Sequence, residues 1–338
     1  MSLAEALELG LDRAARLRPV AGKLPHVTGD DGRWQLLSPV GREREALTGL
    51  PWTGGFVAGQ LWLAGEHEAA VDVTELLAPR AAQATTHDLG FLFWPSAVLG
   101  GDRELALRAA ATLVERALPS GVIQVIGALD DPAWRGRTIV DTWPNLRLLW
   151  WAEQEGFAEG GAAARAHLEA TLDALLRPDG STFHAARIAD DGSVLERGTV
   201  NGYADDSTWA RGQAWAIHGL ASAGYRDEAE RAARWFLGHL PEDGIPPWDF
   251  DREAPKDSSS AAIAASALLG LGWDDEACRL LEALAAHCLN RGEGDGILLH
   301  CAYRPARGVA LDCASAWGDF FFLDALLCRR GRPRLRPP

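Results

Sequence analysis

The sequence of 338 residues has few tyrosines, methionines and cysteines: 3, 1 and 5. The five cysteines lie in the last quarter of the chain with no Cys-x-x-Cys pair, so we expect buried free thiols and neither a zinc site nor a full disulfide framework. No run approaches about eighteen uncharged apolar residues, which excludes a membrane-spanning helix. The N-terminal segment MSLAEALELGLDRAARLRPVAG lacks the basic start and unbroken apolar core of a secretory signal, so a cytoplasmic protein is expected.

Several motifs of common enzyme classes are also missing. The chain has no GxxxxGK[ST] loop and no GxGxxG after a strand, which is against nucleotide binding. It has no HExxH, no GxSxG and no His and Cys cluster at ligand spacing, so no metal site is expected. With 47 acidic and 33 basic residues, the formal net charge is −14. An excess of negative charge is against a nucleic-acid or anionic-membrane partner, because either needs a basic patch.

Helical periodicity runs through almost the whole chain, in two alternating kinds of segment. One kind is amphipathic, as in Leu168, Leu172, Leu175 and Leu176 with charged residues on the other face. The other kind is apolar or weakly polar all round, as in SSSAAIAASALLGLG near residue 265, and predicts a helix packed on several sides. The expected helices span residues 3–17, 54–66, 68–82, 88–99, 103–117, 142–155, 160–176, 206–223, 226–239, 257–271, 274–289 and 316–329.

Alternation of buried and amphipathic helices predicts six hairpins in two concentric rings, an all-α toroid whose inner helices face a central pocket. No linker divides the chain, so we expect one domain over residues 1–338. The single β-like interruption is TFHAARIADDGSVLERGTV, two extended runs around 190–192. This segment predicts a hairpin at the rim of the pocket, with a turn suited to positive φ.

Four aspartates stand at or just before the expected buried helices: Asp88, Asp141, Asp206 and Asp257. Each can be a simple N-cap, worth about 1 kcal/mol. In an inner-ring helix, however, the N-terminal end opens towards the pocket, where an aspartate can also protrude. Two carboxylates facing a pocket suit sugar hydrolysis, in which one acts as an acid and the other is ionised. Asp88 and Asp141 are the candidates for this pair.

Other residues near these aspartates can have either a structural role or a role in substrate binding. His87 and His184 can be core histidines, and Trp215 can be core rather than a sugar platform. Arg211 and Trp215, four residues apart, lie on one helix face, where a guanidinium and an indole can hold the carboxylate and the ring of an acidic sugar. The sequence has 14 tryptophans, and several of them lie beside the aspartate motifs.

The motifs at these positions resemble the unsaturated glucuronyl hydrolases of glycoside hydrolase family 88, with the unsaturated rhamnogalacturonyl hydrolases of family 105 as relatives. The resemblance covers most of the chain and is carried by PWTGGFVAGQLWLAGE, THDLGFLF, IVDTWPNLRLLWWAEQEG, GYADDSTWARGQAWAIHG, IPPWDF, KDSSSAAIAASALLGL and WGDFFFLDAL. It implies an (α/α)6 barrel. It also implies hydrolysis of the 4,5-unsaturated uronic acid that polysaccharide lyases leave at a non-reducing end.

The resemblance implies a role for each matching residue. Asp141 would protonate C4 of the C4=C5 bond and assist water attack at C5, while Asp88 would orient the ring. The substrate-binding residues implied are Trp52, His87, Trp134, His184, Asn201, Arg211 and Trp215. No metal or organic cofactor is implied, because the enol ether of the substrate supplies the reactivity. The implied partners are oligosaccharides from glycosaminoglycan, gellan, ulvan or pectin, bound by a monomer or homodimer.

The sequence departs from the usual family pattern at several positions. Asn201 stands where Gln is usual, Lys256 where Arg is usual, His218 where Tyr is common, and Phe320 and Phe321 replace tyrosines. Two other functions also suit a Trp-rich toroid: a sugar epimerase, which would use histidines for proton abstraction, and a sugar-binding protein without catalysis. The specific motifs centre on aspartate, which favours the hydrolase.

Overall fold

The computed structural model describes residues 2–40 and 51–333, and its helices alternate along the chain between an outer and an inner ring. The outer helices are α1 (Leu3–Ala14), α3 (His67–Leu77), α5 (Arg103–Val114), α8 (Ala158–Leu175), α10 (Arg226–Gly238) and α12 (Asp274–His287). The inner helices are α2 (Gly54–Ala64), α4 (Leu89–Phe93), α6 (Thr142–Asn145) continued by α7 (Arg147–Gln154), α9 (Ala210–Ser222), α11 (Ser258–Leu271) and α13 (Ala316–Arg329).

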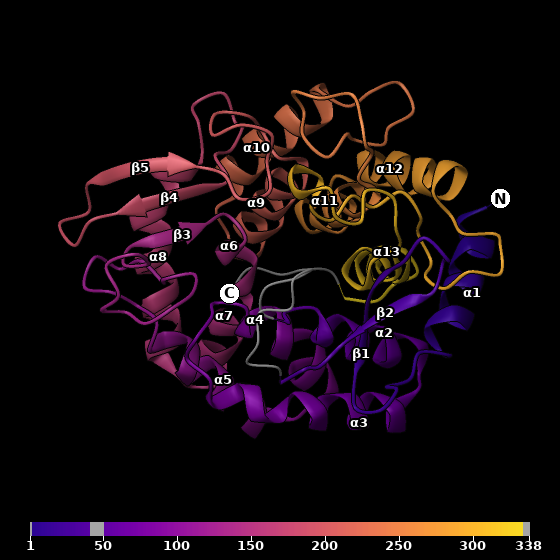
Figure 1. The fold of residues 1–338 in the computed structure, drawn as a ribbon, viewed down its shortest axis with the longest axis horizontal. Coiled ribbons are helices and arrows are strands. Elements are labelled where there is room, and N and C mark those ends of the chain that lie inside the picture. The colour runs from indigo at the N-terminus through magenta and orange to yellow at the C-terminus, as the bar shows by residue number, and fades with distance from the viewer. Residues whose placement is uncertain (1, 41–50, 334–338) are drawn as a thin grey trace.

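Contacts between neighbouring inner helices close the ring. Helix α2 packs on α4, α4 on α6, α6 on α9, α9 on α11, α11 on α13, and α13 returns to α2. Figure 1 shows these helices around the middle of the molecule, with the amphipathic helices outside them. The expected (α/α)6 toroid is therefore confirmed.

Burial follows the two sequence patterns. In α11, every residue from Ser258 to Leu269 is buried, because the helix touches α9, α12 and α13. Outer helix α12 buries one stripe only, which includes Leu280, Leu281 and Leu284, as its periodicity predicts. Small residues let the inner helices approach closely. A Cβ at Gly55 of α2 would lie 2.2 Å from the carbonyl oxygen of Phe91, so no larger residue fits there.

Several helices differ in extent from the prediction. The segment 68–82 divides into α3 and a 3-10 turn, η1 (Ala78–Ala82), and 88–99 divides into α4 and a π-helical turn, η2 (Trp94–Val98). Proline at the start of each turn removes a backbone donor. Helix α9 begins at Ala210 rather than 206, because Arg177 binds the carbonyl oxygens of Asp206 and Ser207 and holds them out of the helix.

The predicted hairpin is present as β4 (Ala185–Ile188) and β5 (Val194–Gly198), and Gly192 in its turn has φ of 85°. A third strand, β3 (Arg137–Ile139), pairs antiparallel with β4. The expectation of a single β-like interruption is wrong. A second hairpin, β1 (Leu24–Thr28) with β2 (Trp34–Leu37), precedes α2. It was missed because β1 is buried at every position and so shows no alternation.

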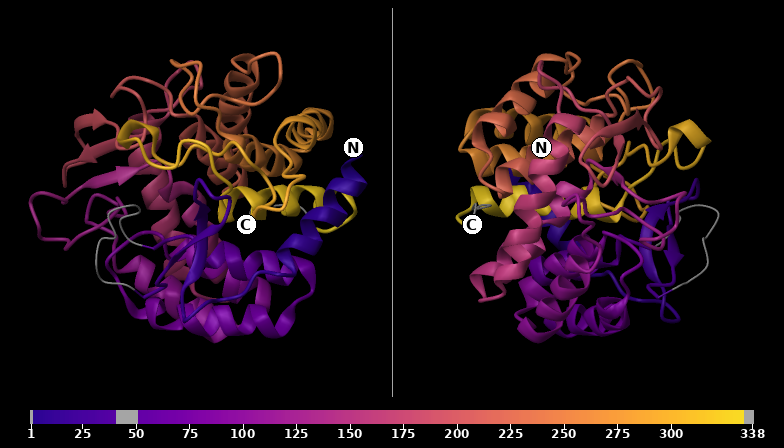
Figure 2. Two further views of the ribbon diagram at one scale, coloured as in Figure 1. Left: turned by 45° about the vertical axis from the view of Figure 1, so that its right-hand side comes forward. Right: turned by 90° about the vertical axis from the view of Figure 1, so that its left-hand side faces the viewer.

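Both strand groups lie at one end of the barrel. The right-hand view of Figure 2 shows β1–β2, β4–β5 and the short helix η3 (Pro305–Arg307) on one side of the helical body. The inner helices α4, α6, α9 and α11 start at the same end, after the connecting segments that carry Asp88, Asp141, Trp209 and Asp257. Side chains at the starts of different helices can therefore meet in one site.

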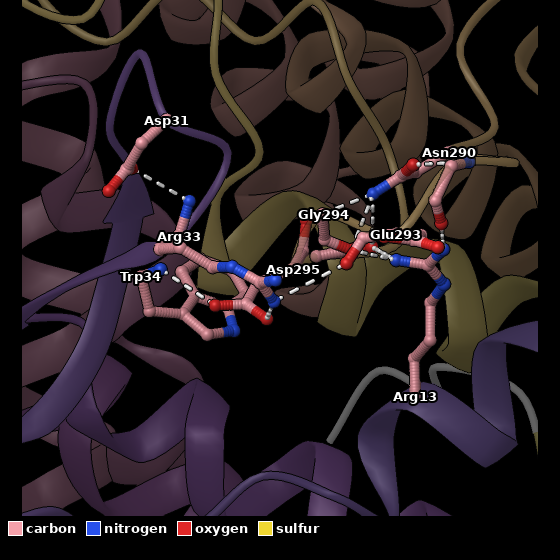
Figure 3. Close-up of polar contacts among 10 residues, drawn as sticks. Arg13, Asp31, Arg33, Trp34, Asn290, Glu293, Gly294 and Asp295 are labelled. Atoms are coloured by element: carbon pink, nitrogen blue, oxygen red, sulfur yellow. Dashed lines mark hydrogen bonds and ion pairs between the residues drawn. The ribbon is translucent and has the colours of Figure 1, made fainter.

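An arginine from the first helix holds the loop that leads towards this end. The Arg13 guanidinium donates to the carbonyl oxygens of Gly292, Gly294 and Gly296 at 2.6, 2.5 and 2.7 Å. Figure 3 shows Arg13 reaching from its helix to the loop that contains Gly294. Asp295 in the same loop accepts from the backbone N–H of Trp34 at 2.9 Å and so ties the β1–β2 hairpin to it. Helix α1, the hairpin and the 290–296 loop thus form one connected unit.

A buried carboxyl of α13 continues this unit. The Asp319 oxygens accept from the backbone N–H groups of Ile297 and Leu298, each at 2.8 Å. Burial raises the pKa of Asp319 to about 7. We expect Asp319→Ala to lower the free energy of unfolding by about 1–3 kcal/mol for each N–H left without a partner, as measured by urea denaturation. The exposed-residue control Asp130→Ala is expected to change it by less than about 0.5 kcal/mol. Equal stability of the two variants would contradict this role.

The five cysteines are free thiols, as predicted, and all but Cys278 are buried. Within residues 2–40 and 51–333, no helix is long and apolar enough to cross a bilayer.

Candidate active site

Two carboxylates stand at the starts of neighbouring inner helices. Asp88 immediately precedes α4, and Asp141 immediately precedes α6; their side chains are 16% and 14% exposed. The IxDTxxNL segment connects the two helices through Asn145. The Asn145 side chain accepts from the N–H of Phe91 at 2.7 Å and donates to the carbonyl oxygen of Asp141 at 2.9 Å. The motif therefore holds the two aspartate-bearing turns against each other.

The structure separates the four aspartates that the sequence left as possible caps. Neither Asp88 nor Asp141 makes a side-chain capping hydrogen bond. Asp257 does cap α11, because its side chain accepts from the N–H of Ser259. Asp206 is exposed and lies before α9 begins. Capping thus accounts for Asp257, while the carboxylates of Asp88 and Asp141 remain available for chemistry.

The two available carboxylates have different partners. One oxygen of Asp88 accepts from the hydroxyl of Thr86 at 2.6 Å, and the other lies 3.3 Å from His87 Nε2. Donors at these positions stabilise a negative charge. Oδ2 of Asp141 is buried and accepts no hydrogen bond from the residues that the structure describes. Asp141 is therefore the member of the pair whose surroundings favour the protonated form.

The pKa of Asp141 agrees with this difference in surroundings. Burial raises the pKa of Asp141 to about 7, the Arg211 charge opposes the shift, and the Asp88 charge adds to it. A carboxyl with a pKa near 7 is protonated in a useful fraction of molecules at neutral pH. Asp141 is therefore suited to act as an acid beside the hydrogen-bonded carboxylate of Asp88.

Both predicted histidines lie beside the carboxylates. His87 Nδ1 is 2.7 Å from the hydroxyl of Thr142, and burial lowers the pKa of His87. His184 Nε2 is 3.7 Å from Asp141 Oδ2, and burial lowers the pKa of His184 to about 3. Each imidazole is therefore neutral at physiological pH and can offer a hydrogen bond without bringing a charge.

Arg211 does not present the free guanidinium that the sequence suggests. Nη1 donates to Asp257 at 2.7 Å and to the carbonyl oxygen of Ala302 at 3.0 Å, and Nη2 donates to the carbonyl oxygen of Tyr303 at 2.7 Å. The residue is 1% exposed. The expectation that the Arg211 guanidinium is free to bind a substrate carboxylate is corrected, because Asp257, 46 positions along the chain, already pairs with it. The Arg211 charge still acts on the pKa values of Asp141 and His184.

Removal of Arg211 is expected to act mainly on stability. Arg211→Met leaves the fully buried Asp257 carboxylate unpaired, so we expect the free energy of unfolding to fall by about 3–5 kcal/mol in urea denaturation. Adding Asp257→Asn should recover part of the loss. As a control, Arg16→Met breaks an ion pair whose side chains are 74% and 59% exposed and should cost less than about 1 kcal/mol. A stable Arg211→Met variant with only a raised KM would contradict this account.

The predicted tryptophans divide between partly exposed and buried positions. Trp52 and Trp134 are partly exposed, and Trp52 Nε1 donates to Tyr303 Oη at 3.4 Å. Trp215 is fully buried, with its ring centroid 4.8 Å from that of Phe91, so the expected sugar platform at Trp215 is corrected to a buried aromatic layer. Trp209 is 2% exposed, and its ring centroid lies 4.6 Å from that of His184.

The positions that depart from the family pattern lie partly behind this layer. His218 is buried one turn beyond Trp215, with its ring centroid 5.1 Å from that of Phe321. Lys256 instead forms an ion pair with Asp243. Asn201 follows β5 and is partly buried, and its Oδ1 is enclosed and receives no hydrogen bond within the described part of the chain. Among the departures, Asn201 is therefore the one beside the candidate site.

Sequence reasoning missed the hydroxyl groups of the site. Thr86, Thr142 and Thr199 each hydrogen-bond an aspartate or histidine of the site. Thr86 and Thr142 adjoin the candidate residues in THD and DTW, which was the available signal. Thr199 lies 15 residues from its partner His184, and only the β4–β5 hairpin brings the two together. Among the described residues, no group of three or more His, Cys, Asp or Glu could hold a metal ion.

An (α/α)6 barrel with a protonatable aspartate and a hydrogen-bonded aspartate at the starts of neighbouring inner helices defines a glycoside hydrolase site. The chain is 33% identical to the unsaturated glucuronyl hydrolase of Bacillus sp. GL1, over 93% of each chain. It is 32% identical to the unsaturated chondroitin disaccharide hydrolase of Streptococcus pneumoniae, over 82% of this chain and 81% of that one. The solved Bacillus sp. GL1 structure matches with a TM-score of 0.87 and 31% identity, covering 99% and 98% of the two chains. No protein-family model matches the chain.

The chain belongs to the unsaturated glucuronyl hydrolase family and is a glycosidase of that type. The resemblance seen in the sequence motifs is thereby confirmed.

Proposed function

We propose that residues 1–338 act as one catalytic domain that removes a 4,5-unsaturated uronic acid from the non-reducing end of lyase-generated oligosaccharides, with Asp141 as the general acid and base. The observation that carries the proposal is the environment of Asp141. Its Oδ2 atom is buried and lacks a hydrogen-bonded partner among the described residues, and burial raises the pKa of the carboxyl to about 7. Such a group can give up a proton at neutral pH and take one back within the same turnover.

In the proposed reaction, Asp141 takes part in two proton transfers and forms no covalent bond with the substrate. Asp141 gives its proton to C4 of the C4=C5 bond, and the positive charge that develops at C5 is shared with the ring oxygen. Water then adds at C5 and returns a proton to Asp141. The C5 hemiketal opens as the proton of its hydroxyl passes to the ring oxygen and the bond from C5 to that oxygen breaks. This leaves a ketone at C5 and a hemiacetal at C1. The hemiacetal then passes its hydroxyl proton to the oxygen of the second sugar, which leaves as an alcohol, and C1 becomes an aldehyde.

The other residues support these steps. We assign Asp88 to the ring hydroxyls, because Thr86 and His87 hold its carboxylate in a fixed direction. His184 and Asn201 lie on the Asp141 side and can face the uronate, whose charge the nearby Arg211 also favours. The partly exposed rings of Trp52 and Trp134 provide apolar walls for the sugars.

The relatives indicate a substrate class. The Bacillus sp. GL1 structure is described as responsible for glycosaminoglycan degradation, and the Streptococcus pneumoniae relative is an unsaturated chondroitin disaccharide hydrolase. We propose unsaturated glycosaminoglycan disaccharides as the first substrates to test, with fragments of gellan, ulvan and pectin beside them. The proposed location is the cytoplasm, where imported oligosaccharides would be hydrolysed.

Loss of the ultraviolet absorbance of the conjugated enoate tests the activity directly. Incubation with an unsaturated disaccharide should remove that absorbance and release an equal amount of the second sugar. Saturated disaccharides of the same composition are the control and should remain intact. If the absorbance persists with every fragment class in the panel, the proposed activity is wrong.

The site geometry is less suited to a sugar epimerase. Such an enzyme would need a histidine that takes a proton from carbon, and the pKa of His184 is lowered to about 3, which makes it a weak base. Incorporation of solvent deuterium at a sugar C2 without cleavage would support epimerisation instead. Sugar affinity with no turnover of any unsaturated substrate would support a binding protein.

A further inference from the structure

The Nδ1 atom of His184 is surrounded by donors from the loop after β5. It lies 3.0 Å from the backbone N of Val200 and 3.3 Å from the backbone N of Asn201. A backbone N–H can only donate, so Nδ1 accepts and carries no proton. The neutral ring of His184 therefore has its proton on Nε2.

The hydroxyl of Thr199 completes this arrangement. Thr199 Oγ1 accepts from the backbone N–H of Gly202 at 2.7 Å, which uses the oxygen as an acceptor and leaves its hydrogen to be donated. His184 Nδ1 lies 3.0 Å away and is an acceptor. The backbone N–H of Thr199 itself is held by Asp205 at 2.9 Å. The loop is thus built so that the Thr199 hydroxyl points its hydrogen at the imidazole.

The tautomer of His184 bears on the proton of Asp141. Nε2–H faces Asp141 Oδ2 across 3.7 Å, and both atoms are buried. At 3.7 Å the two atoms form no hydrogen bond, but the positive end of the Nε2–H dipole still favours a lone pair rather than a proton on Oδ2. The acidic proton is then placed on Oδ1, the oxygen of Asp141 that is not enclosed in this way. The other tautomer would turn a lone pair of Nε2 towards Oδ2 and draw the proton away from the pocket.

The geometry points to Thr199 as a positioning residue that holds the 199–202 turn, whose N–H groups select the Nε2–H tautomer of His184, and that thereby places the transferable proton of Asp141 on Oδ1. The inference rests on the proposed acid role of Asp141. It concerns a residue that contacts neither Asp141 nor the other carboxylate directly. Thr199 acts through His184 and is not itself a catalytic residue.

Two substitutions separate the hydroxyl from the shape of the side chain. Thr199→Val keeps the branched shape and removes the donor, while Thr199→Ser keeps the donor. We expect Thr199→Val to lower kcat by about tenfold with KM changed less than about twofold, the size that loss of one hydrogen bond in a transition state produces. Thr199→Ser should restore most of the rate. Thr112→Val, which removes a buried hydroxyl bonded to Ala81 in the outer ring, is the control for stability alone.

Nitrogen NMR of the histidine ring supplies a readout that needs no substrate. In the wild-type protein, His184 should show an unprotonated Nδ1 and a protonated Nε2 above pH 5. Thr199→Val removes the acceptor that ties the turn to the Gly202 N–H, so the N–H groups of Val200 and Asn201 should move off Nδ1, and the two nitrogen shifts should move towards each other as the tautomers mix. Unchanged shifts in Thr199→Val would overturn the inference, as would equal losses of rate in Thr199→Val and Thr199→Ser. Inactivity of the wild-type protein on every unsaturated substrate would instead reject the proposed function.

Discussion

Replacing Asp141 with asparagine is expected to lower kcat on an unsaturated disaccharide by about 10²–10⁴-fold, the range for loss of a general acid and base. Asparagine has nearly the same shape and keeps a polar carbonyl, but it cannot give a proton to C4 or take one from water. Loss of the enoate absorbance measures the rate, and calorimetric titration of the variant with the disaccharide measures binding. We expect the dissociation constant of the variant for the disaccharide to lie within about tenfold of the wild-type KM.

Asp257→Asn is the matched control for this variant. It changes a buried aspartate that caps α11 and pairs with Arg211, so it should lower the free energy of unfolding while affecting kcat less than Asp141→Asn does. Circular dichroism would show whether both variants fold. A nearly active Asp141→Asn enzyme would remove Asp141 from the role proposed for it.

Turnover is expected to fall as the pH rises through about 7. The acid form of Asp141 is the reactive one, and its pKa is raised to about 7, so kcat/KM should drop by about tenfold for each pH unit above that midpoint. Asp88→Asn should also move the midpoint to lower pH, because the Asp88 charge is one of the causes of the raised pKa. Rates measured from pH 5 to pH 9 with wild-type, Asp88→Asn and the surface control Asp130→Asn would show both effects. A midpoint that does not move in Asp88→Asn would contradict electrostatic coupling of the pair.

Stability has to be followed in the same pH series. The folded-state pKa values of Asp141 and Asp319 are raised from 3.8 to about 7, so both contribute stability in their neutral forms that is lost as the pH rises from about 4 to 7. Asp319 lies in the unit formed with the 297–298 backbone and has no part in the proposed proton transfer. Urea denaturation at each pH would therefore separate a loss of fold from the titration of the active carboxyl.

The unequal surroundings of the two aspartates explain how one site can hold an acid and an anion together. The Thr86 hydroxyl donates to Asp88, and His87 Nε2 lies 3.3 Å from its other oxygen; both residues adjoin Asp88 in the sequence. Asp141 is largely buried, and the charges of Arg211 and Asp88 act on its carboxyl in opposite directions. Thr86 and His87 are neutral, and Arg211 is already paired with Asp257. Binding of a charged substrate therefore does not require these side chains to give up their present partners.

Most of the architecture followed from local patterns in the chain. The alternation of all-apolar segments with amphipathic ones predicted the two rings, because a helix without a polar face must be enclosed. Turn residues around Gly192 predicted the β4–β5 hairpin. The β1–β2 hairpin could not be recognised in this way, because burial of every β1 residue leaves no alternating pattern.

The sequence by itself determined the ring of helices, the position of the aspartates at the helix starts and the family to which their motifs point. Only the tertiary structure decided which aspartates cap helices and that the Arg211 guanidinium pairs with Asp257. It also decided that Trp215 is buried and that Thr199 contacts His184. The physical reason is that helix periodicity and turns depend on neighbours along the chain. Protonation and hydrogen bonding in the site depend on burial and on partners from distant segments, which folding alone brings together.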